Sequence, residues 1–245
     1  MDGKEPVTLD YSPLLCLDTS TPVGSVALYG RSGLLASFTQ ESPRAHTERF
    51  FSTAESLLAD CGLTLAELGG VAVAAGPGSF TGLRIAASAA KTLAWVLEKP
   101  LFAAGSLKAL SFGAAAWRLP VCAVLDAGKE EFYAACYDWG EPGSKAKELF
   151  HPVALSAEKL CTALADAAAG RPLICLGPGF RKLREKLLSA LGSLVKQVPE
   201  RFDLPDAALL GELVLNDPEE YRVKDILTFE PFYVRLGQAE LRLKS

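Results

Sequence analysis

Short apolar runs bounded by turn residues alternate along this chain with longer segments whose apolar residues recur every three or four positions. The short runs predict strands, and the longer segments predict helices. In the first half, three strands precede a helix, and a further strand and helix follow before a fifth strand and a third helix. The predicted strands lie at 14–18, 24–29, 34–39, 71–75 and 101–104, and the predicted helices at 47–61, 81–97 and 106–117.

The second half repeats this order. Strands are predicted at 121–125, 131–137, 148–154 and 173–176, and helices at 156–169, with Ser156 as N-cap, and at 180–191. The first strand of each half ends in an aspartate, Asp18 or Asp126, and the fourth strand of each half runs into Gly-Pro-Gly, at 76–78 and at 177–179.

This repetition predicts an α/β protein of two similar lobes, each with the order βββαβα and with helices packed on a mixed sheet. We place the N-terminal lobe at 1–104 and the C-terminal lobe at 105–245. A late helix near 206–216 can pack back on the N-terminal lobe.

The composition excludes several classes of protein. Of the 245 residues, 49% are hydrophobic and 22% are charged, which excludes a disordered chain. The net charge is −4, whereas a domain that grips nucleic acid unaided is usually strongly basic, and the basic run at 181–186 is more typical of a solvated helix face than of an RNA site. The sequence has neither a signal-peptide core nor an apolar stretch long enough to span a membrane, so we expect a cytoplasmic protein.

Cysteine and histidine usage indicates no metal site. None of the six cysteines forms a CxxC pair, and neither His46 nor His151 completes a metal-ligand spacing with them. Most of the cysteines lie in apolar runs, so we expect buried free thiols. Two histidines leave few candidates for a Ser–His–Asp triad, and we therefore predict no catalytic residues.

The densest motif joins the fourth predicted strand to the second predicted helix. Its candidate site residues are Gly76, Pro77, Gly78, Ser79, Phe80, Thr81, Gly82 and Arg84. One interpretation is a phosphate-binding loop at a helix N-terminus, with Ser79 or Thr81 as the cap. However, a Walker loop needs a lysine and a hydroxyl after Gly82, and a dinucleotide fingerprint needs glycine where Thr81 stands. The alternative, a tight strand-to-helix turn, is therefore favoured.

Asp18 and Asp126 form a second candidate site. Carboxylates at the ends of facing strands can hold a metal–nucleotide between two lobes, and Thr19 can donate to a phosphate. The turn after Asp18 lacks an early glycine that would let a phosphate rest on the backbone. These three residues are therefore candidates for a vestigial nucleotide site rather than for catalysis.

The predicted helix at 81–97 is apolar on nearly every face, with alanines between larger apolar residues. Such a helix must be covered all round, either by this fold alone or by a partner chain as well. Because the neighbouring helix at 47–61 also has an apolar residue off its main stripe, we favour a helix-on-helix interface between chains. The candidate partner-binding residues are Glu48, Phe51, Glu55, Leu58, Ala87, Ala90, Lys91 and Ala94.

Several strings together resemble one family. These are Leu17-Asp18-Thr19-Ser20, His46 before a helix, the string GPGSFTGLRI from Gly76 to Ile85, Asp126 followed by Glu131-Phe132-Tyr133, and Pro231-Phe232-Tyr233-Val234-Arg235. Their residues and order resemble the bacterial TsaB (YeaZ) proteins over essentially the whole chain. The resemblance implies the actin/Hsp70/sugar-kinase (ASKHA) fold with two ribonuclease H-like lobes, in agreement with the duplication.

The resemblance also implies a function. It implies a non-catalytic subunit of the complex that forms N6-threonylcarbamoyladenosine at position 37 of tRNAs. The implied partners are a catalytic paralogue, TsaD, and an ATPase, TsaE, with a homodimer when the chain is alone. The implied contact with the paralogue or a second copy is a four-helix one, made here by 47–61 and 81–97. The chain itself is expected to need no cofactor, because the partner subunits use ATP and Mg²⁺, and to meet tRNA only within the complex.

One absence supports a non-catalytic role. The catalytic paralogue has an HxxxH metal motif, and Ser106 and Leu110 stand at the corresponding positions here. Two positions depart from the family pattern, with Ala86 for a usual glycine and Gly128 for a usual arginine.

The alternatives are a small-molecule kinase of the same fold that uses Mg-ATP at Asp18 and Asp126 and, ranked lowest, a peptidase.

Overall fold

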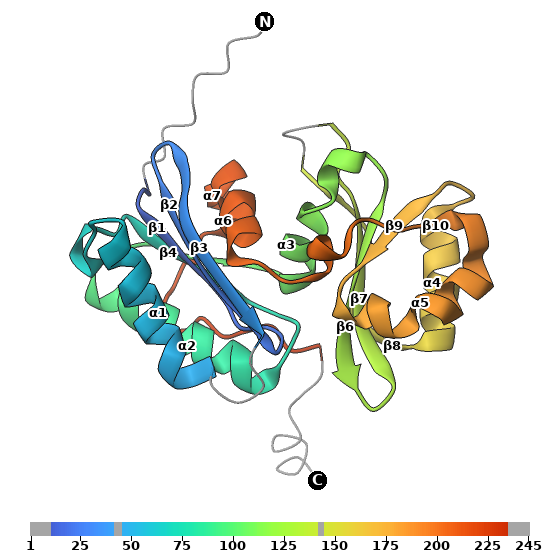
Figure 1. Cartoon of the computed structure of the whole chain (residues 1–245), viewed down its shortest axis with the longest axis horizontal. Coiled ribbons are helices and arrows are strands. Elements are labelled where there is room, and N and C mark those ends of the chain that lie inside the picture. The colour runs from blue at the N-terminus through green and yellow to red at the C-terminus, as the bar shows by residue number, and fades with distance from the viewer. Residues whose placement is uncertain (1–10, 42–45, 142–144, 235–245) are drawn as a thin grey trace, which may run out of the picture.

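The computed structural model describes residues 11–41, 46–141 and 145–234, and side chains in the first helix from Ser52 onward. It contains two five-stranded sheets with the same strand order, β3-β2-β1-β4-β5 and β8-β7-β6-β9-β10 (Figure 1). The first sheet consists of β1 (Leu14–Asp18), β2 (Val23–Gly30), β3 (Gly33–Glu41), β4 (Gly70–Ala74) and β5 (Leu101–Ala104). The second consists of β6 (Val121–Gly128), β7 (Glu131–Asp138), β8 (Lys147–Ser156), β9 (Leu173–Leu176) and β10 (Val195–Lys196).

The pairing confirms the α/β duplication predicted from the sequence. In each sheet the first strand pairs antiparallel with the second and parallel with the fourth. The fifth strand of the second sheet, β10, was not predicted, because two residues are too short to show a period. The predicted helix at 106–117 is in fact α3 (Ser106–Phe112), and a separate 3-10 turn follows at Ala115–Trp117.

Helices cover the outer face of each sheet. On the first sheet these are α1 (His46–Asp60) and α2 (Phe80–Val96), and on the second α4 (Ala157–Ala168) and α5 (Pro178–Leu191) (Figure 1). Leu15 and Leu17 of β1 belong to the core under α1 and α2, whereas Leu14 and Cys16 belong to the core on the opposite face. Since both faces of β1 are buried, the strand reads as a continuous apolar run rather than as an alternation.

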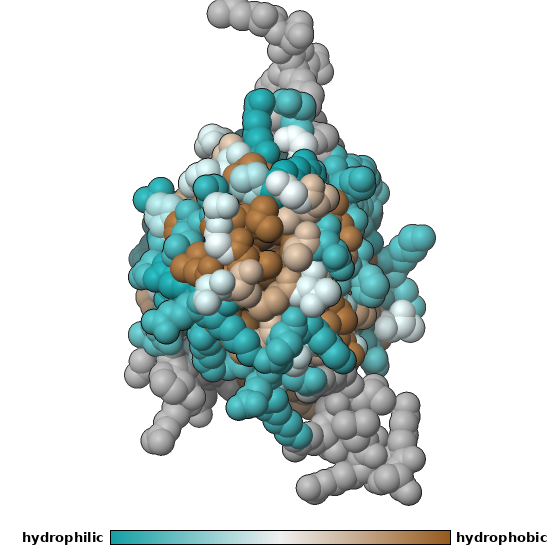
Figure 2. Space-filling model, turned by 90° about the vertical axis from the view of Figure 1, so that its right-hand side faces the viewer, coloured by the Kyte–Doolittle hydropathy of each residue, from teal (hydrophilic) through white to brown (hydrophobic). Residues whose placement is uncertain are grey.

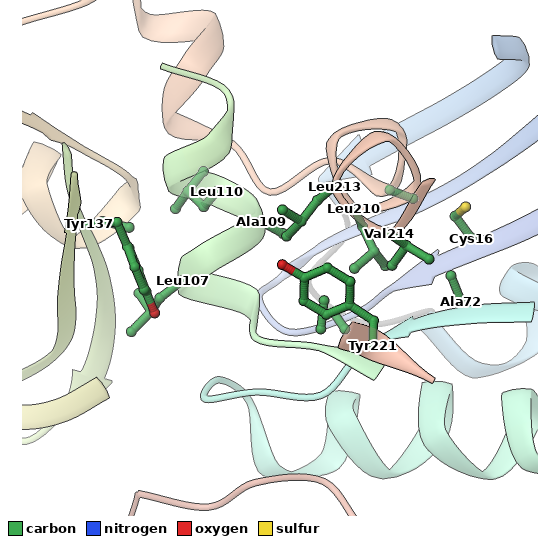
Figure 3. Close-up of a cluster of buried hydrophobic side chains, with 14 of the residues drawn as sticks. Cys16, Ala72, Leu107, Ala109, Leu110, Tyr137, Leu210, Leu213, Val214 and Tyr221 are labelled. Atoms are coloured by element: carbon green, nitrogen blue, oxygen red, sulfur yellow. The ribbon is translucent and has the colours of Figure 1, made fainter. Parts of the chain in front are cut away.

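The two inner faces share one hydrophobic core. It is built around two helices that each follow one sheet in the chain and pack on the other. Helix α3 follows β5 of the first sheet but packs on β6 and β7 of the second. Helix α6 (Ala207–Asn216) follows β10 of the second sheet but packs on β1, β2 and β4 of the first. In Figure 3, Ala109 of α3 faces Leu213 of α6, whereas Leu107 lies towards Tyr137 of β7, and all of them belong to a single buried cluster.

The last described residues of the chain therefore lie on the first lobe. Ser25 of β2 accepts a hydrogen bond from the Ala207 N–H at 2.9 Å, and the Tyr29 hydroxyl of β2 donates to the Ala208 carbonyl at 2.7 Å. After α7 (Pro218–Tyr221), Arg222 forms a bridge with Phe102 of β5, and the Val223 N–H donates to the Leu101 carbonyl. Residues 207–234 thus lie with the first sheet although they follow the second in sequence.

Four of the six free cysteines are buried, as the apolar runs predict, while Cys61 and Cys161 are partly exposed. Within the residues that the structure describes, no helix is long and apolar enough to cross a membrane.

The core that α3 and α6 share leads to a testable prediction. Leu210→Ala removes a fully buried side chain from the core shared by the lobes, and we expect it to lower the free energy of unfolding by about 2–5 kcal/mol. Because both lobes depend on that core, urea unfolding followed by tryptophan fluorescence and by circular dichroism should shift together. The control Leu227→Ala, at a side chain that is 68% exposed, should change stability by less than about 0.5 kcal/mol. Two separated transitions in Leu210→Ala would contradict the shared core.

Candidate functional site

The motif loop joins β4 to α2 and lies directly against the turn after β1. The Ser79 N–H donates to the Ser20 carbonyl at 2.7 Å, and the Ser79 side chain caps α2 by accepting from the Gly82 N–H at 3.2 Å. The Thr19 hydroxyl donates to the Gly82 carbonyl at 2.7 Å. The backbone donors of Ser79 and Gly82, which a bound phosphate would need, are therefore already used within the chain.

The glycines in the loop allow two backbones to approach closely. A Cβ added to Gly82 would overlap the Thr19 carbonyl, and one added to Gly78 would overlap the Ser20 carbonyl. In the second lobe, a Cβ on Gly177 would overlap the Val124 carbonyl in the same way. The repeated Gly-Pro-Gly thus seats a strand-to-helix turn on the end of the first strand in both lobes, which favours the tight-turn interpretation over the phosphate loop.

The loop is closed on its other side by the C-terminal segment. The Phe232 N–H donates to the Ala75 carbonyl at 2.7 Å. The Arg84 guanidinium lies 3.9 Å from the centre of the Phe80 ring, and its Nε donates to the Tyr233 hydroxyl at 3.3 Å. This clamp joins two motifs that the sequence analysis treated separately, and a contact between residues so far apart in the chain leaves no periodic signal.

The two candidate aspartates are in different environments. Asp18 is only 1% exposed, and it accepts a hydrogen bond from the Ser20 N–H at 2.8 Å. Burial raises the pKa of Asp18 to about 6, despite the opposing hydrogen bonds from Ser20. For Asp126, burial alone would raise the pKa, but the Lys182 ammonium and the Gly128 N–H lower it overall. Asp126 is thus bound in an ion pair with Lys182 of α5.

The two positions that correspond to the histidines of the HxxxH metal motif have structural roles here. The Ser106 hydroxyl accepts from the Gly76 N–H at 3.1 Å, and Leu110 lies in the central core. His151 is exposed on β8, and the side chain of His46 lies outside the described residues. No group of three or more histidine, cysteine, aspartate or glutamate side chains in the described part of the chain is placed to hold a metal ion.

The structure corrects the sequence interpretation of the partner-binding residues. Leu58, Ala90 and Ala94 are 2% exposed or less and pack in the core between the helices and the first sheet. Their side chains face the sheet rather than a partner: Leu58 lies on the buried side of α1, and the small Ala90 and Ala94 let α2 lie close on the sheet. Ala87 is also buried, at 3% exposed.

Lys91 forms hydrogen bonds with the segment that follows α7. Its ammonium donates to the carbonyls of Leu227 and Phe229, at 2.9 and 2.8 Å. This segment therefore covers the part of α2 around Lys91. Glu55 is exposed on α1, while the side chains of Glu48 and Phe51 lie outside the described residues.

A different face of α2 is open. It forms a shallow groove of about 590 Å³ lined mostly by small or apolar residues, namely Thr81, Ile85, Ser88, Ala89, Thr92 and Leu93. Phe80 and Arg84, which also contact Tyr233, complete the lining. Ser88 and Thr92 are exposed one turn apart, and the Thr92 hydroxyl is turned back onto the Ser88 carbonyl at 2.8 Å. Trp95 and Val96, 64% and 66% exposed, continue the open surface at the end of the helix. The sequence could not separate this face from the buried one, because alanine and other small residues occur all round the helix.

The basic run on α5 is neutralised within the chain. Arg181 pairs with the buried Asp203 at 3.0 Å, and Arg184 with Glu200 at 3.4 Å. Lys182 and Lys186 pair with Asp126 and Glu158. On this side of the second lobe, hydrophilic residues surround a central apolar area (Figure 2). Ion pairs of this kind support the solvated-face interpretation rather than an RNA site.

Comparisons with known proteins agree with the fold and the motifs. Residues 35–161 match the family model for TsaD, tRNA N6-adenosine threonylcarbamoyltransferase. The chain is 34% identical to the tRNA threonylcarbamoyladenosine biosynthesis protein TsaB of Haemophilus influenzae, over 91% of this chain and 93% of that protein. It is 27% identical to TsaB of Bacillus subtilis, over 94% and 96%. Among solved structures, YeaZ from Pseudomonas aeruginosa superposes with a TM-score of 0.73 at 27% identity, over 90% of this chain and 98% of that one.

Burial of Asp18 predicts a pH-dependent stability. Its pKa is raised in the folded state, so its contribution is most favourable below pH 4 and is lost as the pH rises towards 6. We expect Asp18→Asn, which does not titrate, to gain stability over the wild type between these pH values, by up to about 3 kcal/mol above pH 6. Urea unfolding at pH 4, 5, 6 and 7.5 measures this. Asp126→Asn is the control, because the pKa of Asp126 is lowered in the folded state and its removal should therefore reduce stability at neutral pH. Parallel pH profiles of the two variants would contradict the prediction.

The close backbone approach at the loop predicts that Gly82 tolerates no side chain. Gly82→Ala should cost about 3 kcal/mol or more, because either α2 or the Thr19 turn must move. Gly105→Ala is a matched control, since the nearest atom to its added Cβ is 3.6 Å away, and it should cost less than about 1 kcal/mol. Thermal unfolding of the two variants compares them. Equal melting temperatures would show that the approach is not needed.

Proposed function

Because this chain belongs to the TsaB family of tRNA threonylcarbamoyladenosine biosynthesis proteins, we propose that it is a non-catalytic subunit that binds and activates a TsaD-type catalytic paralogue. The family places the chain in the biosynthesis of this modified nucleoside. The paralogue, an ATPase of the TsaE type and a homodimer in the absence of the paralogue are the proposed partners.

The observation that carries the proposal is the open face of α2. A helix that exposes Ser88 and Thr92 beside Ile85, with Trp95 and Val96 at its end, offers small residues for close helix approach and apolar area to bury. The proposed occupant is a helix pair of similar shape, from the paralogue or from a second copy of this chain. Glu55, on the neighbouring helix α1, would then lie at the rim of the contact rather than at its centre.

The environment of the candidate chemistry supports a subunit without its own reaction. Thr19 donates to Gly82, Asp126 is paired with Lys182, and Ser106 holds the Gly76 N–H, so these groups already serve the fold. The same observations count against a kinase that uses Mg-ATP at Asp18 and Asp126. In this proposal ATP and Mg²⁺ are used by the partner subunits, and the chain binds no cofactor of its own.

The charge supports an indirect relation to RNA. The net charge is −4, and the basic residues of α5 are bound in ion pairs. We propose that tRNA is held within the complex chiefly by the partner subunits, and that the protein works in the cytoplasm, where tRNA is modified.

The interface predicts that a charge on the open face of α2 blocks association. Thr92→Arg should weaken binding to the TsaD-type paralogue at least about tenfold, because a guanidinium would be buried without a partner. Thr162→Arg on α4 is the matched control, since both threonines are exposed and both hydroxyls donate to the carbonyl four residues earlier. Binding is measured by calorimetry, and modified nucleoside formation by mass spectrometry of tRNA in the reconstituted system.

The two readouts separate the possible outcomes. If Thr92→Arg and Thr162→Arg bind the paralogue equally well, the assignment of this face is wrong. If the wild-type chain binds the paralogue but the yield of modified nucleoside is the same without it, the activating role is wrong. Ala90→Arg is unsuitable as a test, because Ala90 is fully buried and a charge there would unfold the chain.

A further inference from the structure

A second pocket lies between the lobes, on elements that the proposed interface does not use. It has a volume of about 530 Å³, which is within the range of about 300–1,000 Å³ typical of small-molecule sites. Three parts of the chain line it: α3 with the 3-10 turn that follows, the connection between β7 and β8, and α6 with α7. Asp18 and the motif loop are not among the lining residues.

The floor of the pocket is apolar and partly aromatic. Phe112 and Trp139 meet edge to face with their ring centres 5.1 Å apart, and Leu213 and Ala115 lie beside them in the lining. Trp139 is 7% exposed and Leu213 is 3% exposed, so the floor is formed by core side chains that packing holds in place. A flat apolar group fits such a floor.

The rim is a chain of ion pairs. Glu220 is 2.5 Å from the Lys108 ammonium and 3.2 Å from that of Lys145, and Lys145 is also 2.7 Å from Asp217. Arg118 is paired with Glu141 at 3.3 Å. All three lining cations are thus already neutralised by carboxylates.

One lining carboxylate is in excess. The described lining contains three cations and four carboxylates, and within the described residues Glu212 of α6 takes part in no ion pair. Its side chain is exposed at the mouth, next in sequence to the floor residue Leu213. An ammonium group would compensate this carboxylate and could also interact with the aromatic floor, whereas an anion would have to displace an existing pair.

We propose that this pocket binds a small primary amine that carries a flat apolar ring. The ring rests on Phe112, Trp139 and Leu213, and the ammonium group pairs with Glu212. Because α3, α6 and the β7–β8 connection all contribute, the bound ligand joins segments that pack on different sheets. The site does not depend on the proposed interface.

The test uses the full chain with Trp139 as the single tryptophan, through Trp95→Phe and Trp117→Phe. The probes are 2-phenylethylamine, 3-phenylpropionate and 2-phenylethanol, which share a ring and differ in charge. With excitation at 295 nm, 2-phenylethylamine should produce a saturable change in Trp139 fluorescence. The alcohol and the acid should bind at least about tenfold more weakly, as expected for loss of one charged contact.

Variants locate the site. In the same background, Glu212→Gln should weaken the amine about tenfold, while Glu185→Gln, an exposed glutamate on α5, should leave its affinity unchanged. Ala116→Phe, at an exposed lining residue, should fill the mouth and abolish the signal without disturbing the core. Equal binding of all three probes, tighter binding of the acid, no saturable signal, or an amine affinity that Glu212→Gln leaves unchanged would each overturn the proposal.

Discussion

The arrangement of the whole molecule depends on the packing of α3 against α6. Each of these helices follows the last strand of one sheet and covers the inner face of the other, so the two inner faces share one buried cluster. The inner face of the first sheet is not covered by the stretch of chain that contains its own strands, because its cover, α6, comes after the second sheet in the sequence. The lobes are therefore similar in topology but not independent in stability, and the chain has to return to its first lobe before that lobe is complete.

The return of the chain to the first lobe also determines which faces of α2 are open to a partner. The segment after α7 lies over α2, where Lys91 holds two of its carbonyls and Arg84 meets Tyr233. One face of α2 thus belongs to the sheet, a second to the C-terminal segment, and a third is open. The apolar residues of α2 are thus divided between the core and the surface. Its small residues serve both, because they allow close packing on either side of the helix.

The sequence predicted local features well and long-range ones poorly. Both Gly-Pro-Gly turns, the caps Ser79 and Ser156, and the repeated order of strands follow from short-range chemistry, and the structure contains them. The short strand β10 and the contacts of Lys91 with the Leu227 and Phe229 carbonyls could not be predicted, since neither leaves a periodic pattern. The assignment of Ala90 and Ala94 of α2 to the interface was wrong, because a helix that is apolar all round does not indicate which face meets its own sheet, and Leu58 of α1 is likewise buried against the sheet.

The same packing links the proposed interface to the proposed ligand pocket. The pocket between the lobes is bounded by α3 and α6, which hold the sheets together, and the open face of α2 lies on the far side of the first sheet from α6. A ligand that contacts both α6 and the β7–β8 connection would bridge elements of the two lobes. Because α2 rests on β4 and α6 on the opposite face of the same strand, a single sheet separates the pocket helix α6 from the helix that carries the proposed interface.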